Sequence, residues 1–175
     1  MPRSAKTSCW MGVSSGAIPR EWSFSGSMRQ VEAISESKMK RITIESLLEE
    51  IERKTATDER IIVAISGPPG SGKSTLACQL ATRIGSTAAV LPMDGFHLDN
   101  SDLREMGMWH RKGAPETFDA HGFVALIRKV AMQPTVSFPT FDRQADKTVP
   151  NGGQIEAHVR VVFVEGNYLL LNQPG

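Results

Sequence analysis

A glycine-rich run of nine residues carries the strongest chemical signal in the chain. It reads Gly-Pro-Pro-Gly-Ser-Gly-Lys-Ser-Thr over residues 67–75 and fits the pattern Gly-x4-Gly-Lys-Ser at every required position. Glycines lack a Cβ, so backbone N–H groups can turn inward around a polyphosphate. Lys73 could then reach the β- and γ-phosphates of a nucleotide, and the Ser74 hydroxyl could bind Mg²⁺. We interpret the run as a phosphate-binding loop made of Gly67, Pro68, Pro69, Gly70, Ser71, Gly72, Lys73, Ser74 and Thr75.

The segments on either side of this loop support that interpretation. The apolar, β-branched run before it predicts a buried strand over residues 61–66, and the pattern after it predicts an amphipathic helix that ends at Gly85. The N-terminus of that helix would direct its N–H donors and the positive end of its dipole at bound phosphates. A chance Gly/Ser turn before a helix is the alternative, and the preceding strand argues against it.

Two carboxylates follow apolar strands elsewhere in the chain. Asp94 follows a strand predicted over residues 87–93, and Glu165 follows one predicted over residues 158–164. In an open α/β sheet the ligand crevice lies at the carboxyl ends of the strands, so we expect both acids to converge on the γ-phosphate. One could act as base for an incoming hydroxyl while the other holds Mg²⁺. The alternative is that each acid only caps the turn that follows its strand.

The order of the strands follows from the same requirement. Only a strand 61–66 that lies beside the strand 159–164 would bring Glu165 close to Ser74 and a shared Mg²⁺. Strands that alternate with helices, predicted at residues 43–54 and 119–132, indicate an α/β fold: a phosphate-loop, three-layer architecture with a mainly parallel sheet.

Several local predictions complete this outline. We expect Ser101 or Asp102 to cap a short helix that runs to Met106. A short strand should cover residues 135–138 and end before Pro139, and the polar segment 142–153 should be a mobile loop or a small hairpin.

Composition bounds the partners and the compartment. The chain has 175 residues, of which 40% are hydrophobic, and a net charge of +1 from 20 basic and 19 acidic residues. These values predict a single soluble domain with neither a nucleic acid nor a membrane as partner. No apolar run approaches the roughly 18 residues of a membrane span. The two cysteines, Cys9 and Cys78, form no disulfide framework or metal-ligand spacing, which fits a reducing, cytoplasmic location.

Residues 1–40 differ from the rest of the chain. Seven serines fall within the first 27 residues, and no acid precedes Glu21. A targeting peptide has this composition, but no clear amphipathic arginine helix accompanies it. We therefore expect a disordered or spurious N-terminal extension that adds nothing to the core, followed by one phosphate-loop domain over residues 41–175.

Four further motifs, taken in order, resemble those of a known family. They are Met-Asp-Gly-Phe-His at residues 93–97, Pro-Glu-Thr-Phe-Asp at 115–119, Pro-Thr-Phe-Asp-Arg at 139–143 and Val-Glu-Gly-Asn-Tyr at 164–168. Together with the phosphate loop they resemble the uridine kinase, phosphoribulokinase and pantothenate kinase group of P-loop kinases. The similarity is greatest to a bacterial subgroup of nucleoside-, pantothenate- and fructokinase-like proteins, and it covers the chain from about residue 43 to its end.

The resemblance implies ATP- and Mg²⁺-dependent phosphorylation of a hydroxyl on a sugar, nucleoside or pantothenate-like acceptor. By position, Asp94 would be the base, Lys73 would act with it in catalysis, and Ser74 and Glu165 would hold Mg²⁺. Phe141 stands where uridine kinases place Tyr, which argues against a nucleoside acceptor. The acceptor pocket would be lined by Asp94, His97, Arg111, Phe141, Asp142, Arg143 and Tyr168.

The C-terminal part of the family pattern does not appear in this sequence. Family members continue through a lid helix that carries arginines, so we expect the C-terminal third of the family domain to be missing. Charge stabilisation by such arginines can contribute several orders of magnitude in rate. A nucleotide-binding or regulatory module with little catalysis is therefore the alternative function. A GTP switch is disfavoured because the Asn-Lys-x-Asp guanine motif does not occur. The sequence does not decide whether the chain forms a homodimer.

Overall fold

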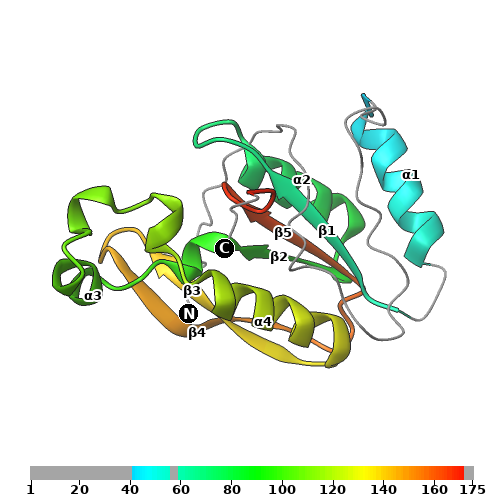
Figure 1. Ribbon diagram of the computed structural model, residues 1–175. Coiled ribbons are helices and arrows are strands. Elements are labelled where there is room, and N and C mark those ends of the chain that lie inside the picture. Colours follow the sequence, from blue (N-terminus) through cyan, green and yellow to red (C-terminus); the bar gives the residue numbers. More distant parts are fainter. Residues whose placement is uncertain (1–40, 56–58, 172–175) are drawn as a thin grey trace, which may run out of the picture.

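The computed structural model describes residues 41–55 and 59–171, so the extension predicted over residues 1–40 lies outside the described part. A three-stranded parallel sheet forms its centre, in the order β1 (Ile61–Ser66), β5 (Val161–Gly166) and β2 (Ala88–Pro92) (Figure 1). Ile65 of β1 and Pro92 of β2 both pair with Glu165 of β5. The predicted neighbourhood of β1 and β5 is therefore confirmed, with β2 next outward.

Alternate residues of β5 face two different helical layers. Val161 and Phe163 pack in one core cluster with Ala77 and Leu80 of α2 (Lys73–Ile84) and with Ile51 of α1 (Ile44–Thr55). Val162 and Val164 belong to the second cluster, which lies against α4 (Ala120–Met132) and the β3–β4 hairpin. Figure 1 shows α1 and α2 on one side of the sheet and α4 on the other. This is the predicted three-layer α/β arrangement, and it explains why every residue of β5 is buried.

The hairpin of β3 (Val136–Asp142) and β4 (Lys147–Ile155) corrects two predictions. The strand does not end before Pro139, because the pairing register shifts between Phe138 and Thr140 and the shift accommodates a residue without an N–H donor. The segment 142–153 is no mobile loop: after a short turn it forms β4, as the hairpin alternative had it. A Cβ added at Gly153 would lie 2.4 Å from the Phe138 ring, so the close pairing requires glycine there.

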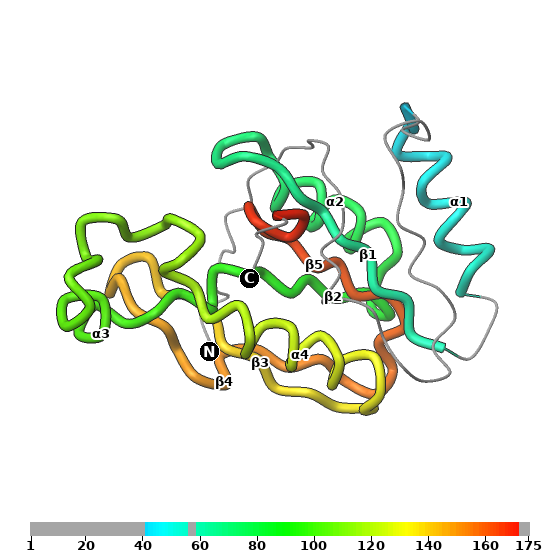
Figure 2. The backbone as a smooth tube through the Cα atoms, viewed as in Figure 1, coloured from blue at the N-terminus to red at the C-terminus, as the bar shows by residue number. Residues whose placement is uncertain are grey.

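Short helical segments connect β2 to α4. They are η3 (Met93–Phe96), α3 (Asn100–Glu105), η4 (Trp109–Arg111) and η5 (Pro115–Thr117). The N-cap position of α3 is Asp99, so the prediction of a cap at Ser101 or Asp102 was wrong. In Figure 2 the turn of the hairpin lies beside the loops around α3, and these two regions form the rim next to the carboxyl end of β2.

Arg60, just before β1, ties the amino end of the sheet to the end of α4. Its guanidinium donates hydrogen bonds to five backbone carbonyl oxygens, at the end of α4 and around the start of β5. They belong to Val130, Gln133, Pro134, Glu156 and Val159. None of the helices in the described part of the chain is long and apolar enough to cross a membrane.

Candidate active site

The phosphate loop has the backbone shape that an anion cradle requires. Gly70 and Gly72 have φ angles of 73° and 85°, in the left-handed region that glycine adopts without strain. A Cβ added at Gly70 would meet no atom within 4 Å, so the loop is open at that point. The first turn of α2 contains no acidic residue, and its N-cap, Gly72, makes no side-chain cap. This helix end therefore fits a bound phosphate.

Lys73 lies buried under the loop. Its side chain is 6% exposed, and its Nζ donates to the Pro68 carbonyl oxygen at 2.8 Å. The Ser71 hydroxyl donates to the same oxygen. Burial lowers the pKa of Lys73, while the nearby carboxylates of Glu165 and Asp94 act in the opposite direction. Lys73 is thus placed between the loop and both predicted carboxylates.

Glu165 and Ser74 are brought together as predicted. Glu165 is 6% exposed at the carboxyl end of β5, and it accepts a hydrogen bond from the Ser74 hydroxyl. Burial raises the pKa of Glu165; the Ser74 hydrogen bond partly opposes this, and the negative charge of Asp94 adds to it. The contact exists because β1, which leads into the loop, pairs directly with β5.

The Ser74–Glu165 pair is suited to Mg²⁺ bound together with a nucleotide. Mg²⁺ prefers oxygen ligands and in nucleotide sites usually takes one or two from the protein, with water and phosphate oxygens completing the shell. Over residues 41–55 and 59–171 there is no cluster of three or more His, Cys, Asp or Glu side chains that could hold a metal. The donor set fits a shared metal of this kind and not an all-protein metal cage.

Asp94 is the second residue of η3, just after the carboxyl end of β2, and its carboxylate is paired with Arg143. The Nη2 atom of Arg143 lies 2.5 Å from Oδ2 of Asp94. Arg143 comes from the turn of the hairpin, and its charge also acts on Glu165. Lys73, Asp94, Arg143 and Glu165 therefore form one electrostatic cluster. Sequence reasoning placed both Asp94 and Arg143 at the site but did not foresee that they bind each other.

His97 connects the segment after β2 with the β3–β4 hairpin. Its ring contacts those of Phe118 and Phe141, with centroid distances of 4.0 and 4.8 Å. Its Nδ1 lies 2.8 Å from the Asp94 carbonyl oxygen, and its own carbonyl oxygen accepts a hydrogen bond from Thr148 of β4. These contacts fix the backbone of Asp94 and the neighbouring hairpin, and a contact of His97 with an acceptor stays a prediction.

The other residues predicted for the acceptor pocket come from the rim and, in the case of Tyr168, from the segment after β5. Tyr168 donates to the Gly113 carbonyl oxygen at 2.6 Å, and its ring contacts Phe118. Arg111 forms an ion pair with Glu116 at 2.5 Å. Asp142 accepts hydrogen bonds from two backbone N–H groups of the hairpin turn. Their role in acceptor binding stays a prediction as well.

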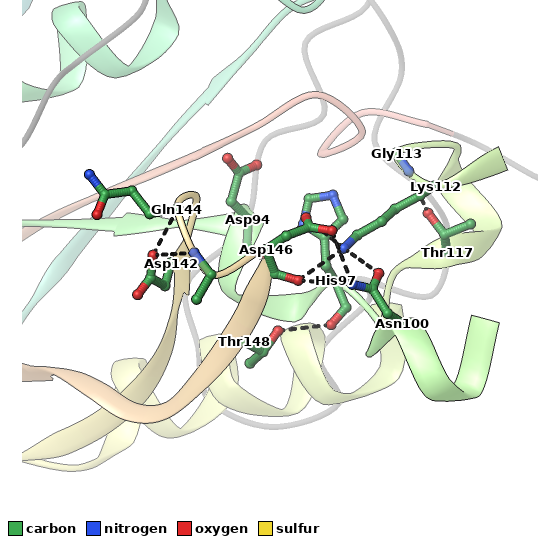
Figure 3. A network of polar contacts seen from close by, with 11 residues as sticks. Asp94, His97, Asn100, Lys112, Gly113, Thr117, Asp142, Gln144, Asp146 and Thr148 are labelled. Atoms are coloured by element: carbon green, nitrogen blue, oxygen red, sulfur yellow. Dashed lines mark hydrogen bonds and ion pairs between the residues drawn. The ribbon is translucent and has the colours of Figure 1, made fainter. Parts of the chain in front are cut away.

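A network that the sequence did not reveal joins the hairpin to α3 (Figure 3). Lys112 Nζ lies 2.7 Å from Asn100 Oδ1 and 2.8 Å from Asp146 Oδ1, and Asn100 also donates to Asp146. Lys112 lowers the pKa of Asp146, with Asn100 as the second cause. Asn100 begins α3, Lys112 lies between η4 and η5, and Asp146 lies in the hairpin turn. Because the three residues are far apart in the chain, no spacing in the sequence could have indicated the network. In Figure 3 the Asp94 carboxylate points away from it.

Comparison with known proteins places this geometry in a family. No protein-family model matches the chain. A protein named "Putative uridine kinase C227.14" from Schizosaccharomyces pombe is 40% identical over 128 residues, which cover 66% of this chain and 54% of that protein. The pantothenate kinase of Lactococcus lactis strain IL1403 is 30% identical over 117 residues, or 64% of this chain and 38% of the enzyme. The crystal structure of a "putative fructose transport system kinase" from Silicibacter sp. TM1040 superposes with a TM-score of 0.69, at 42% identity, over 77% of this chain and 68% of that one.

The chain belongs to the P-loop kinases of the uridine kinase family. The predicted family and the predicted P-loop fold are both confirmed. The chain spans only part of the length of these curated relatives: 54% of the fission yeast protein and 38% of the pantothenate kinase. The relatives carry names that refer to different acceptors, so the family alone does not identify the acceptor of this chain.

Proposed function

We propose that this P-loop kinase transfers the γ-phosphoryl group of ATP to a hydroxyl on a small molecule. One observation carries the proposal: the Ser74–Glu165 contact lies beside the buried Lys73, with the Asp94 carboxylate close enough to act on both charged groups. A phosphate loop, a pair of residues that can hold Mg²⁺ and a candidate base are the parts that phosphoryl transfer to a hydroxyl requires. The kinase names of the relatives support the same reaction class.

The nucleotide side of the site consists of residues 67–75 and Glu165. Backbone N–H groups of the loop and the first turn of α2 would bind the phosphates, and Lys73 would exchange the Pro68 carbonyl oxygen for a phosphate oxygen. Ser74 and Glu165 would hold Mg²⁺, which neutralises charge that develops on the phosphate oxygens. Burial of Lys73 and Glu165 keeps water from competing for these contacts.

On the acceptor side, Asp94 would bind the incoming hydroxyl. The hydroxyl oxygen forms a bond to the γ-phosphorus, the bond from that phosphorus to the bridging oxygen of ADP breaks, and the hydroxyl proton passes to Asp94. His97 would keep Asp94 in position through the Asp94 carbonyl oxygen. The acceptor would be a sugar, a nucleoside or a pantothenate-like compound held by Arg111, Phe141, Asp142, Arg143 and Tyr168.

A nucleotide-binding module with little phosphoryl transfer is the second candidate. The observation in its favour is that Arg143 already engages the carboxylate that a hydroxyl would need. The same loop, with Ser74 and Glu165, would then bind Mg·ATP without an acceptor reaching Asp94.

Replacement of Asp94 by Asn separates the two candidates. Asn keeps the size of Asp but cannot take a proton, so we expect D94N to bind Mg·ATP with nearly unchanged affinity while transfer falls roughly 10²-fold or more. Transfer is measured with γ-labelled ATP and a panel of sugars, nucleosides and pantothenate. Asp102→Asn, on the exposed face of α3, is the matched control and should keep full activity. Transfer within a few-fold of the parent in D94N would contradict the assigned base. Tight Mg·ATP binding without transfer to any acceptor would favour the binding module.

A further inference from the structure

The Arg143–Asp94 ion pair bears on the chemical class of the acceptor. We propose that the acceptor is a small hydroxyl compound that carries an anionic group, a carboxylate or a phosphate. When such a compound binds, its hydroxyl takes the place of Arg143 on Asp94, and its anionic group becomes the new partner of Arg143. The inference rests on the proposed kinase function of the same site.

The first step of the argument is that the candidate base is engaged. A guanidinium–carboxylate contact at 2.5 Å is a charge-assisted hydrogen bond, the stronger class of such bonds in proteins. It occupies Oδ2 of Asp94, one of the two atoms that could receive the acceptor hydroxyl. An acceptor hydroxyl that binds at Oδ2 of Asp94 therefore competes with Arg143.

The second step compares a neutral acceptor with an anionic one. A neutral hydroxyl that displaces Arg143 exchanges a charge-assisted contact for a weaker one and leaves the guanidinium without its carboxylate. An acceptor with an anionic group restores an ion pair to Arg143 at the moment its hydroxyl reaches Asp94. The exchange then conserves charge pairing, so the anionic compound gains affinity over its neutral counterpart.

The third step is that other cations on the acceptor side have different partners. Lys112 donates to Asn100 and Asp146, and Arg111 is paired with Glu116. None of these partners has a part in the proposed proton transfer. Among these three described cations, Arg143 is the one whose partner is the group that the reaction itself needs.

The fourth step is that the Arg143 side chain can move while its backbone stays in place. The hairpin turn is held at one end by Asp142, which accepts hydrogen bonds from Gln144 N at 2.9 Å and Ala145 N at 3.0 Å. At the other end the Lys112–Asp146 contact holds the turn to the neighbouring loops (Figure 3). The Arg143 side chain itself is 72% exposed. A change of rotamer is therefore enough to carry its guanidinium from Asp94 to an acceptor anion.

The test uses matched pairs of compounds that differ in charge. Glycerate with glycerol and pantothenate with pantothenol test a carboxylate, and fructose 1-phosphate with fructose tests a phosphate. Each compound is titrated by calorimetry into the chain saturated with Mg²⁺ and a non-hydrolysable ATP analogue. In the parent we expect at least one anionic compound to bind about tenfold or more tightly than its neutral partner. In Arg143→Gln this preference should fall to within about twofold, whereas Arg53→Gln, the same charge change on the exposed face of α1, should keep it.

Three results of the acceptor titrations would overturn the inference. They are equal affinity for both members of every pair, a preference for the anion that survives Arg143→Gln, and failure of every anionic compound to bind. Titration of the nucleotide analogue alone provides a separate readout, and Arg143→Gln should keep its affinity. If that variant loses nucleotide affinity instead, Arg143 binds the nucleotide phosphates and the inference is also overturned. Phosphorylation of a neutral compound alone would overturn the inference but leave the proposed kinase function intact, whereas a parent chain that does not bind the nucleotide would refute that function itself.

Discussion

Glu165 is the residue at which stability and function oppose each other. Burial raises the pKa of Glu165 above its ordinary value of 4.5, even though Ser74 donates to it and Lys73 lies nearby. A raised pKa means that the folded chain binds the proton more tightly than the unfolded chain does. The folded state therefore loses free energy of unfolding as pH rises from about 4.5 through the pKa of the folded form. Mg²⁺ would use this same ionised carboxylate.

Glu165→Gln should consequently stabilise the nucleotide-free chain at neutral pH and impair nucleotide binding. The neutral amide avoids the cost of a buried charge, so we expect Tm to rise by a few degrees near pH 7 and the difference from the parent to vanish toward pH 4. Thermal unfolding followed by circular dichroism measures this, with the exposed Glu49→Gln on α1 as control. Mg²⁺-dependent affinity for an ATP analogue should fall in the same variant. A lower Tm at pH 7 would show that the charge of Glu165 stabilises the fold.

At the scale of elements, sequence patterns predicted those helices, strands and loops that are determined by residues adjacent in the chain. The strand–loop–helix unit around Lys73 follows from an apolar run, two glycines that need positive φ and an amphipathic period. The β3–β4 hairpin was predicted less well because its pairing contains Pro139 and Gly153, which disfavour strands when considered alone. Pro139 fits because the register shifts beside it, and Gly153 fits because the Phe138 ring lies against it. Both features exist only in the folded hairpin.

The contacts between loops could not be predicted for a related reason. Asp146 lies 34 residues from Lys112, and Asp94 lies 49 residues from Arg143. Each pair meets only after the hairpin has been placed beside the η3–α3 region. Sequence reasoning assigned Asp94 and Arg143 to the same site through a family resemblance, and the partner of each had to come from the structure.

Lys112→Met tests whether the network holds the hairpin turn in place. The methionine keeps the apolar stem but removes the hydrogen bonds to Asn100 and Asp146, so the free energy of unfolding should fall by about 1 kcal/mol. Backbone amides of residues 143–146 should exchange hydrogen faster, with β1 and β5 unaffected. Hydrogen exchange read by mass spectrometry measures this, and Lys129→Met on the exposed side of α4 is the control. Unchanged exchange in the turn would show that the hairpin is held by its strand pairing alone.

At the scale of the whole molecule, the order of three strands assembles the site. β5 lies between β1 and β2, so its carboxyl end places Glu165 between the phosphate loop and Asp94. This arrangement could be inferred from the sequence because the chemistry admits few alternatives. Ser74 and Glu165 can hold one Mg²⁺ together only if both lie at the same end of one sheet. The two core clusters on either side of the sheet, with Arg60 at its amino end, hold the strands in that order.

The central claim is that residues 67–75 bind the phosphates of Mg·ATP, and Lys73 tests it most directly. The measurement is a calorimetric titration of a non-hydrolysable ATP analogue, with and without Mg²⁺, into the parent and into Lys73→Ala. Lys73→Met, which keeps the buried stem, separates loss of charge from loss of packing, and circular dichroism confirms that both variants are folded. We predict Mg²⁺-dependent binding in the parent and affinity at least about tenfold weaker in both variants, because each removes the buried cation directed at the β- and γ-phosphates. Equal affinity in the parent and in two folded variants would contradict the account.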